Sequence, residues 1–140
     1  MLSALFDAGA DYLIVGAHAL AAYDRPRATK DLDIWVRASR ANAERVRRAI
    51  ETFGMAVDKI SVDDLASPGL VLQFGFPPQR IDMMTSISGV TFDEAWPRRI
   101  FVDVEGKQHP VIGKDELIRN KRAAARAQDL VDVKELEKKR

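Results

Sequence analysis

Residues 12–36, YLIVGAHALAAYDRPRATKDLDIWV, contain the pattern from which the fold follows. The apolar run at 12–15 is too short for a buried helix and predicts a central strand. Gly16 then lets the backbone turn sharply into an alanine-rich helical segment at 17–23. After a basic loop, the apolar run at 32–36 predicts a second strand. The stretch therefore predicts a strand, a glycine turn, a short helix and another strand in succession.

Two carboxylates stand at the start of the second predicted strand. Successive side chains of a strand point to opposite faces of the sheet, so Asp31 and Asp33 share one face. Leu32, Ile34 and Val36 share the other. Neighbouring carboxylates repel each other, and Asp is depleted in strands to begin with. Something positive must offset this repulsion, and a divalent cation is the simplest candidate.

A third carboxylate follows from the segment PPQRIDMMTS, residues 77–86, which predicts a strand after a Pro-Pro turn. Ile81 and Met83 are expected to face the core. Asp82 then lies on the opposite face, together with Met84.

The rest of the chain alternates further helices and strands. A helix at 40–53 is expected between a Ser39 cap and Gly54. Other helices are expected at 2–8, for one turn after Ser61, at 91–96, and from 114 to the end with a break near 127–128. Other strands are expected at 70–74, 99–104 and 108–112, the last two as a hairpin around Glu105 and Gly106. We expect one α/β (α+β) domain over residues 1–140, with a sheet core at 1–112 and a C-terminal helical segment at 113–140.

Composition excludes several classes of protein. The sequence has no Cys and two His, which removes disulfides, thiolate chemistry and Cys- or His-rich metal sites. A net charge of +1 argues against a surface that grips nucleic acid throughout. No apolar run approaches the roughly 20 residues that span a bilayer, and no signal-like N-terminus is present. A soluble cytoplasmic protein with no membrane partner is the expectation.

The constellation suits phosphoryl chemistry. A helix that begins at Gly16 directs unpaired N–H groups at an anion. Mg²⁺ prefers oxygen ligands and leaves places for substrate phosphates. Two such ions about 3.5–4 Å apart can hold the attacking and the leaving oxygen of a displacement. Asp31 and Asp33 could bind the nucleotide-bound ion, and Asp82 could complete a second site if its strand lies next to theirs.

These residues resemble a known family. Gly16-Ala17, the run Arg27-Ala28-Thr29-Lys30-Asp31-Leu32-Asp33 and the later Arg80-Ile81-Asp82 are similar to the DNA-polymerase-β-like nucleotidyltransferase superfamily. The likeness is greatest to small bacterial AbiEii-type toxins and minimal nucleotidyltransferases. The segment Asn120-Lys121-Arg122-Ala123, with Arg126, Asp129 and Asp132, resembles a lysine-containing helix that those proteins carry behind the site. The resemblance implies a nucleotidyltransferase-like mixed β-sheet flanked by helices, with C-terminal helices.

The resemblance also implies roles for single residues. Asp31, Asp33 and Asp82 would be the catalytic residues and the ligands of Mg²⁺ or Mn²⁺. The residues that would bind the nucleotide are Gly16, Ala17, Arg27, Thr29, Lys30 and Lys121. Relatives usually carry Gly-Ser or Gly-Gly where this chain has Gly16-Ala17, and Gly where it has Asp24.

Plainer interpretations stay open beside these. Asp31 and Asp33 could be the solvated face of an edge strand, and Gly16 only a tight turn. Asp82 could simply pair with a charge near Arg80 or with solvent. The cations of the basic loop, Arg25, Arg27 and Lys30, could simply be solvated. Lys121 and Arg126 could form surface pairs with Asp129 and Asp132. We expect His18 at a helix surface or in packing, and Trp35 and Trp96 as core or interface anchors.

The leading hypothesis is a metal-dependent nucleotidyltransferase that moves a nucleoside monophosphate from a nucleoside triphosphate such as ATP to a hydroxyl acceptor. The acceptor is left open and could be a protein, an RNA or a small molecule. It is also left open whether the chain binds a protein partner, forms a homodimer or belongs to a toxin–antitoxin pair. The alternative is a catalytically silent, antitoxin-like partner-binding module, which Ala17 and Asp24 favour. A nucleic-acid-binding module has little support from the charge and the few aromatic residues.

Overall fold

A six-stranded sheet in the order β3-β4-β2-β1-β6-β5 forms the centre of the computed structural model, which describes residues 1–23, 31–76 and 79–138. Strand β2 runs antiparallel to β1 and parallel to β4, β1 runs parallel to β6, and the two outer pairs are antiparallel. The sheet is therefore mixed, as expected. The strands are β1 (Tyr12–Val15), β2 (Asp31–Val36), β3 (Val71–Phe74), β4 (Arg80–Met84), β5 (Ile100–Val104) and β6 (Lys107–Val111).

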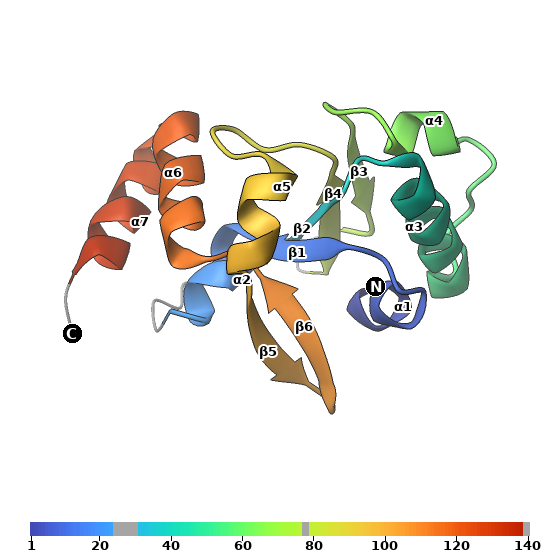
Figure 1. The fold of residues 1–140 in the computed structure, drawn as a ribbon, viewed down its shortest axis with the longest axis horizontal. Coiled ribbons are helices and arrows are strands. Elements are labelled where there is room, and N and C mark those ends of the chain that lie inside the picture. The colour runs from blue at the N-terminus through green and yellow to red at the C-terminus, as the bar shows by residue number, and fades with distance from the viewer. Residues whose placement is uncertain (24–30, 77–78, 139–140) are drawn as a thin grey trace.

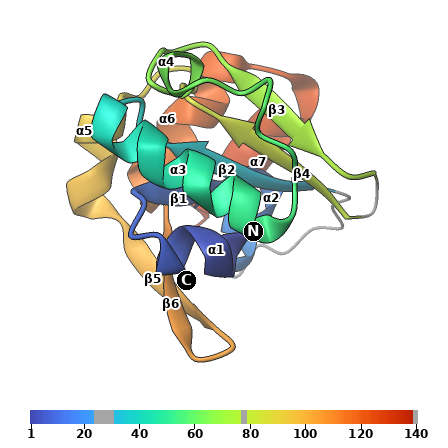
Figure 2. The ribbon, with the colours of Figure 1, turned by 90° about the vertical axis from the view of Figure 1, so that its right-hand side faces the viewer.

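Helices cover both faces of this sheet. Figure 2 shows α1 and α3 in front of the sheet and α6 and α7 behind it. The β5–β6 hairpin projects from the body of the molecule (Figure 1). The helices are α1 (Leu2–Asp7), α2 (Gly16–Ala21), α3 (Arg40–Phe53), α4 (Val62–Leu65), α5 (Phe92–Ala95), α6 (Lys114–Ala124) and α7 (Ala127–Glu137), with a 3₁₀ turn, η1 (Trp96–Arg98), after α5.

Helix α3 has the boundaries that the sequence predicts. The Ser39 side chain accepts a hydrogen bond from the Asn42 N–H, and Gly54 ends the helix with a positive φ of 103°. Its apolar side faces the sheet, where Val46 and Ile50 are fully buried. This helix therefore seals one face of the sheet, as its spacing predicts.

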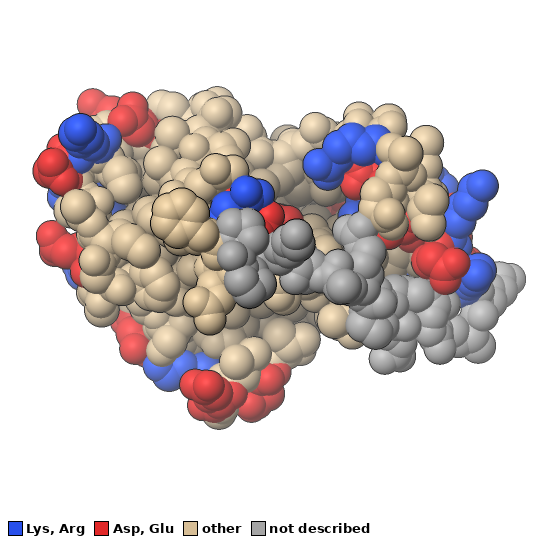
Figure 3. Space-filling view, turned by 180° about the vertical axis from the view of Figure 1, so that it is seen from behind, with Lys and Arg blue, Asp and Glu red and all other residues tan. Residues whose placement is uncertain are grey.

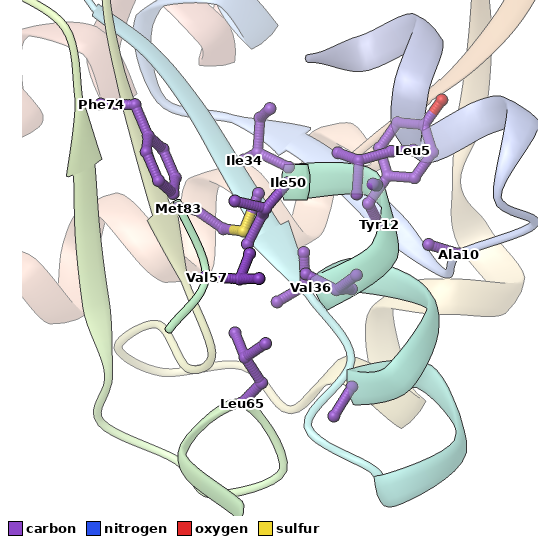
Figure 4. Packing of buried hydrophobic residues seen from close by; sticks show 13 residues of the cluster. Leu5, Ala10, Tyr12, Ile34, Val36, Ile50, Val57, Leu65, Phe74 and Met83 are labelled. Atoms are coloured by element: carbon purple, nitrogen blue, oxygen red, sulfur yellow. The ribbon is translucent and has the colours of Figure 1, made fainter. Parts of the chain in front are cut away.

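The alternation of β2 and β4 sorts their side chains between the two faces. Ile34 and Val36 of β2 and Met83 of β4 join the core cluster under α1, α3 and α4. Figure 4 shows Ile34 and Met83 beside Ile50 of α3. Trp35 belongs to the opposite cluster, under α2, α5, α6 and α7. Asp33 and Asp31 are spaced two and four residues from Trp35, so they lie on the same face of the sheet as Trp35, which α6 and α7 cover.

Some predicted boundaries differ by a few residues. The helix expected at 17–23 begins at Gly16 and ends at Ala21. The break expected near 127–128 comes earlier, because Ala125 adopts a left-handed conformation with φ 54° and ends α6. No helix in the described part of the chain is long and apolar enough to cross a membrane.

Candidate functional site

Three carboxylates from two neighbouring strands meet on one face of the sheet. In the parallel β2–β4 ladder, Asp33 lies opposite Asp82, and Asp31 lies opposite Arg80. The edge-strand interpretation of Asp31 and Asp33 is wrong, because β2 lies between β1 and β4 inside the sheet. We call Asp31, Asp33, Asp82 and Arg80 the strand cluster.

Arg80 holds two of these carboxylates together. Its Nη2 lies 2.5 Å from Oδ2 of Asp31 and 3.3 Å from Oδ2 of Asp82. Its Nε lies 3.1 Å from Oδ1 of Asp82. The carboxyl group of Asp82 therefore points toward the other acidic side chains of the site, as the metal hypothesis requires.

Asp33 has a raised pKa. Burial raises the pKa of Asp33 to about 6, and the negative charges of Asp82 and Asp31 contribute to this rise. The positive charges of His18 and Arg126 oppose the rise without cancelling it. The mutual repulsion of these carboxylates favours a cation near them.

Gly16 packs directly against this cluster. Its φ is +67°, and a Cβ at this position would lie 2.1 Å from Oδ2 of Asp33. Only glycine satisfies both conditions, the left-handed backbone and the missing side chain. The tight-turn interpretation of Gly16 is therefore correct, and the turn also makes room for a carboxylate of the site.

A cleft of about 270 Å³ opens beside the strand cluster. Asp31 and Asp33 form one wall, and the C-terminal helices form the other. Its lining residues are Gly16, Ala17, Asp31, Asp33, Lys121, Arg126, Gln128 and Asp129. The cleft thus brings residues of the first strands and of the C-terminal helices together, and the resemblance places both groups at one site.

Lys121, a predicted nucleotide ligand, is buried with only 3% of its surface exposed. Its Nζ lies 3.0 Å from Oδ2 of Asp132 and 3.6 Å from Oδ1 of Asp129, both on α7. Surface pairing is therefore the wrong description for Lys121, whose ion pairs are buried and join two helices. Its contact with phosphate stays a prediction, since both neighbours compete for its charge.

Arg126 completes this second group, which we call the helix cluster: Lys121, Arg126, Asp129 and Asp132. The exposed Arg126 donates from Nε to Oδ2 of Asp129 at 2.7 Å, an i,i+3 pair as the plainer interpretation expects. Burial alone would raise the pKa of Asp129, but the hydrogen bonds and charge of Arg126, with the charge of Lys121, hold it below its usual value.

The other residues named in the sequence analysis are an exposed histidine, two tryptophans and a basic loop. The ring of His18 hydrogen-bonds through Nδ1 to the backbone oxygen of Asp31 at 3.0 Å, and Trp35 is buried in the core. Trp96 stacks on Phe92 with ring centroids 5.4 Å apart. The basic-loop predictions, Asp24, Arg25, Arg27, Thr29 and Lys30, lie outside the described residues.

Arg80 enters the sequence-based predictions only as part of the motif and as a plainer partner for Asp82, which it does contact; its second contact, with Asp31, is not among them. The alternation that places Asp82 on the acidic face places Arg80, two residues earlier, on the same face. Arg126 and Asp129 enter the predictions only as part of the motif, because their packing depends on how α6 and α7 fold together.

The donor set fits a hard divalent cation in its chemistry, since carboxylate oxygens on one face are what Mg²⁺ and Mn²⁺ bind. The present side-chain arrangement is not yet a coordination shell: among the described residues, no three acidic or histidine side chains are placed to hold a metal ion. The guanidinium of Arg80 lies between Asp31 and Asp82 instead.

Comparison with known proteins supports the fold. No protein-family model matches the sequence, and no curated protein matches it either. A crystal structure of TM1012 from Thermotoga maritima, described as a "putative nucleotidyltransferase", superposes with a TM-score of 0.61 at 13% sequence identity. The match covers 96% of this chain and 88% of that one. The chain thus has a nucleotidyltransferase-like α/β fold: a six-stranded mixed sheet flanked by helices.

Proposed function

We propose that this chain is a metal-dependent nucleotidyltransferase, which transfers a nucleoside monophosphate from a nucleoside triphosphate to a hydroxyl acceptor. The single observation that carries the proposal is the meeting of Asp31, Asp33 and Asp82 on one face of β2 and β4, beside a cleft. The similar fold of TM1012 supports it. Membership of the AbiEii-like branch and a toxin–antitoxin role are finer proposals, which rest on the sequence motifs alone.

Each part of the cleft has a function in this proposal. Asp31, Asp33 and Asp82 would hold Mg²⁺ or Mn²⁺, which when bound supplies positive charge to the reacting phosphate oxygens. Gly16 keeps the backbone clear of the Asp33 carboxylate. Ala17 offers the nucleotide only a backbone N–H, and Lys121 and Arg126 place positive charge on the opposite wall.

On the face shown in Figure 3, the described Lys and Arg side chains are interspersed with Asp and Glu.

Calorimetry of ATP binding with and without Mg²⁺ tests the proposal. We expect Mg²⁺-dependent binding by the wild type and its loss in Asp31→Ala and Asp33→Ala, both still folded. Asp63→Ala is the matched control, since Asp63 is exposed on α4 and pairs with Arg40 there. Binding that is unchanged in both site variants would contradict the assignment.

A second candidate function has one observation in its favour. Because Arg80 already pairs with Asp31 and Asp82, the carboxylates have a positive partner without a metal ion. A catalytically silent, partner-binding module is the result if this arrangement is permanent. Incubation with α-³²P-labelled nucleotide in a lysate separates the two: labelled acceptors that depend on Asp82 show an enzyme, and their absence favours the silent module.

A further inference from the structure

Arg80 is placed where a cation would bind. It opens β4, lies opposite Asp31 in the ladder and stands two residues before Asp82 on the same strand. Through Nη2 and Nε, one guanidinium spans carboxylates of two adjacent strands at 2.5 Å and 3.1 Å. Its planar, forked shape suits this bridging, because two different nitrogens face the two carboxylates.

The charge of Arg80 cannot be removed by deprotonation, because a guanidinium stays protonated in proteins. Any other cation at these oxygens must therefore meet it as a like charge or displace it. Mg²⁺ requires oxygen ligands at about 2.0–2.1 Å, well inside the nitrogen–oxygen distances of the ion pairs. Binding of the ion to these carboxylates therefore brings a second positive charge close to the guanidinium, and the two cations compete for the same groups.

Displacement is sterically available. The Arg80 side chain is 31% exposed, whereas those of Asp31 and Asp82 are 22% and 15% exposed. The arginine thus has a solvent-facing side, while the carboxylates are fixed more deeply in the sheet. Outward rotation of the long side chain would free the carboxylates without moving their strands.

We infer that Arg80 is an internal counter-cation, which competes with the divalent metal ion for Asp31 and Asp82. The inference rests on the proposed function, because it takes these carboxylates as metal ligands. Arg80 is then a positioning residue: it keeps the carboxylates together in the free protein and lowers their affinity for metal until it moves away.

Mn²⁺ binding without nucleotide tests the inference, followed by the loss of the electron paramagnetic resonance signal of free Mn²⁺. We expect Arg80→Gln to bind Mn²⁺ at least about tenfold more tightly than the wild type. Arg40→Gln is the matched control, because it removes the same charge from an exposed pair with Asp63. Its affinity is expected to equal that of the wild type.

Arg80→Lys decides the question if Arg80→Gln does not fold. Lysine keeps the charge, but on a single nitrogen at the end of a shorter side chain, so we expect a smaller gain in affinity in the same direction. Equal or weaker Mn²⁺ binding by the folded Arg80 variants would overturn the inference.

Asp33→Asn separates this failure from failure of the proposed function. If the Arg80 variants bind Mn²⁺ no better than the wild type while Asp33→Asn abolishes binding, the inference is wrong and the metal site stands. If neither the wild type nor any Arg80 variant binds Mn²⁺ in a saturable way, both the inference and the metal site of the proposed function are wrong.

Discussion

The strand cluster and the helix cluster border the same cleft but balance their charges differently. The helix cluster sets two carboxylates against Lys121 and Arg126, and the pKa of Asp129 is lowered. In the strand cluster Arg80 contacts two of the three carboxylates, and the pKa of the third, Asp33, is raised. Raised carboxylate pKa values are found preferentially at functional sites. We therefore expect the helix cluster to contribute mainly stability and the strand cluster mainly ligand binding.

Removing the cation of the helix cluster should have the largest effect. Lys121→Met leaves the nearly buried Asp129 and Asp132 without their shared lysine. We expect a loss of about 3–5 kcal/mol in the free energy of unfolding, measured in urea, because breaking a buried pair leaves uncompensated charge. Lys138→Met, which breaks an exposed pair with Glu135, is the control and should change stability by less than about 1 kcal/mol. A similar small change in both variants would contradict the structural role.

Gly16→Ala should have the next largest effect. The new side chain meets the carboxylate of Asp33 and also requires a positive φ of +67°. We expect a loss of stability of about 1–3 kcal/mol, together with loss of metal binding. Gly106→Ala has a φ of +82° with nothing within 4 Å, so it shows the backbone effect alone. If the two variants lose the same stability, the clash with Asp33 is unimportant.

Neutralising Asp33 of the strand cluster should raise the stability, whereas the two substitutions above lower it. Because the folded pKa of Asp33, about 6, lies above its usual value of 3.8, the folded state binds this proton more tightly than the unfolded state. The stability that Asp33 contributes is present at low pH and is lost as the pH rises through about 4 to 6.

Asp33→Asn removes this dependence. We expect the variant to be more stable than the wild type at pH 7 by roughly 1–2 kcal/mol, after allowance for solvent screening. The advantage should shrink toward pH 4. Urea unfolding at both pH values measures it, and a variant that is less stable at pH 7 would remove the contrast between the clusters.

Arg126→Gln should have the smallest effect. Its side chain is 78% exposed, and Asp129 keeps Lys121 as a neighbour. We expect a loss of about 1 kcal/mol or less by thermal unfolding. A loss as large as that of Lys121→Met would show that the exposed arginine, and not the buried lysine, balances the cluster.

The parts that the sequence predicted are those that depend on local pattern. Alternation along one strand placed Asp31 and Asp33 on one face, and the same rule placed Asp82. Capping residues fixed the ends of α3. Because these features depend on neighbours in the chain, they needed no knowledge of the tertiary structure.

The parts that the sequence did not predict depend on contacts between distant residues. The pairing of Arg80 with Asp31 requires β2 and β4 to be neighbours in one register. The burial of Lys121 requires the chain to turn at Ala125, so that α7 packs back on α6. Neither spacing nor helical propensity contains this information.

The most direct test of the proposed metal site is a crystal soaked with Mn²⁺ and a non-hydrolysable ATP analogue, in which manganese is located by its anomalous scattering. We expect an anomalous peak among the carboxylates of Asp31, Asp33 and Asp82, with the Arg80 guanidinium moved away from Asp31. Nucleotide in the cleft with no peak at these side chains, and Arg80 still bridging Asp31 and Asp82, would contradict a metal-dependent transferase.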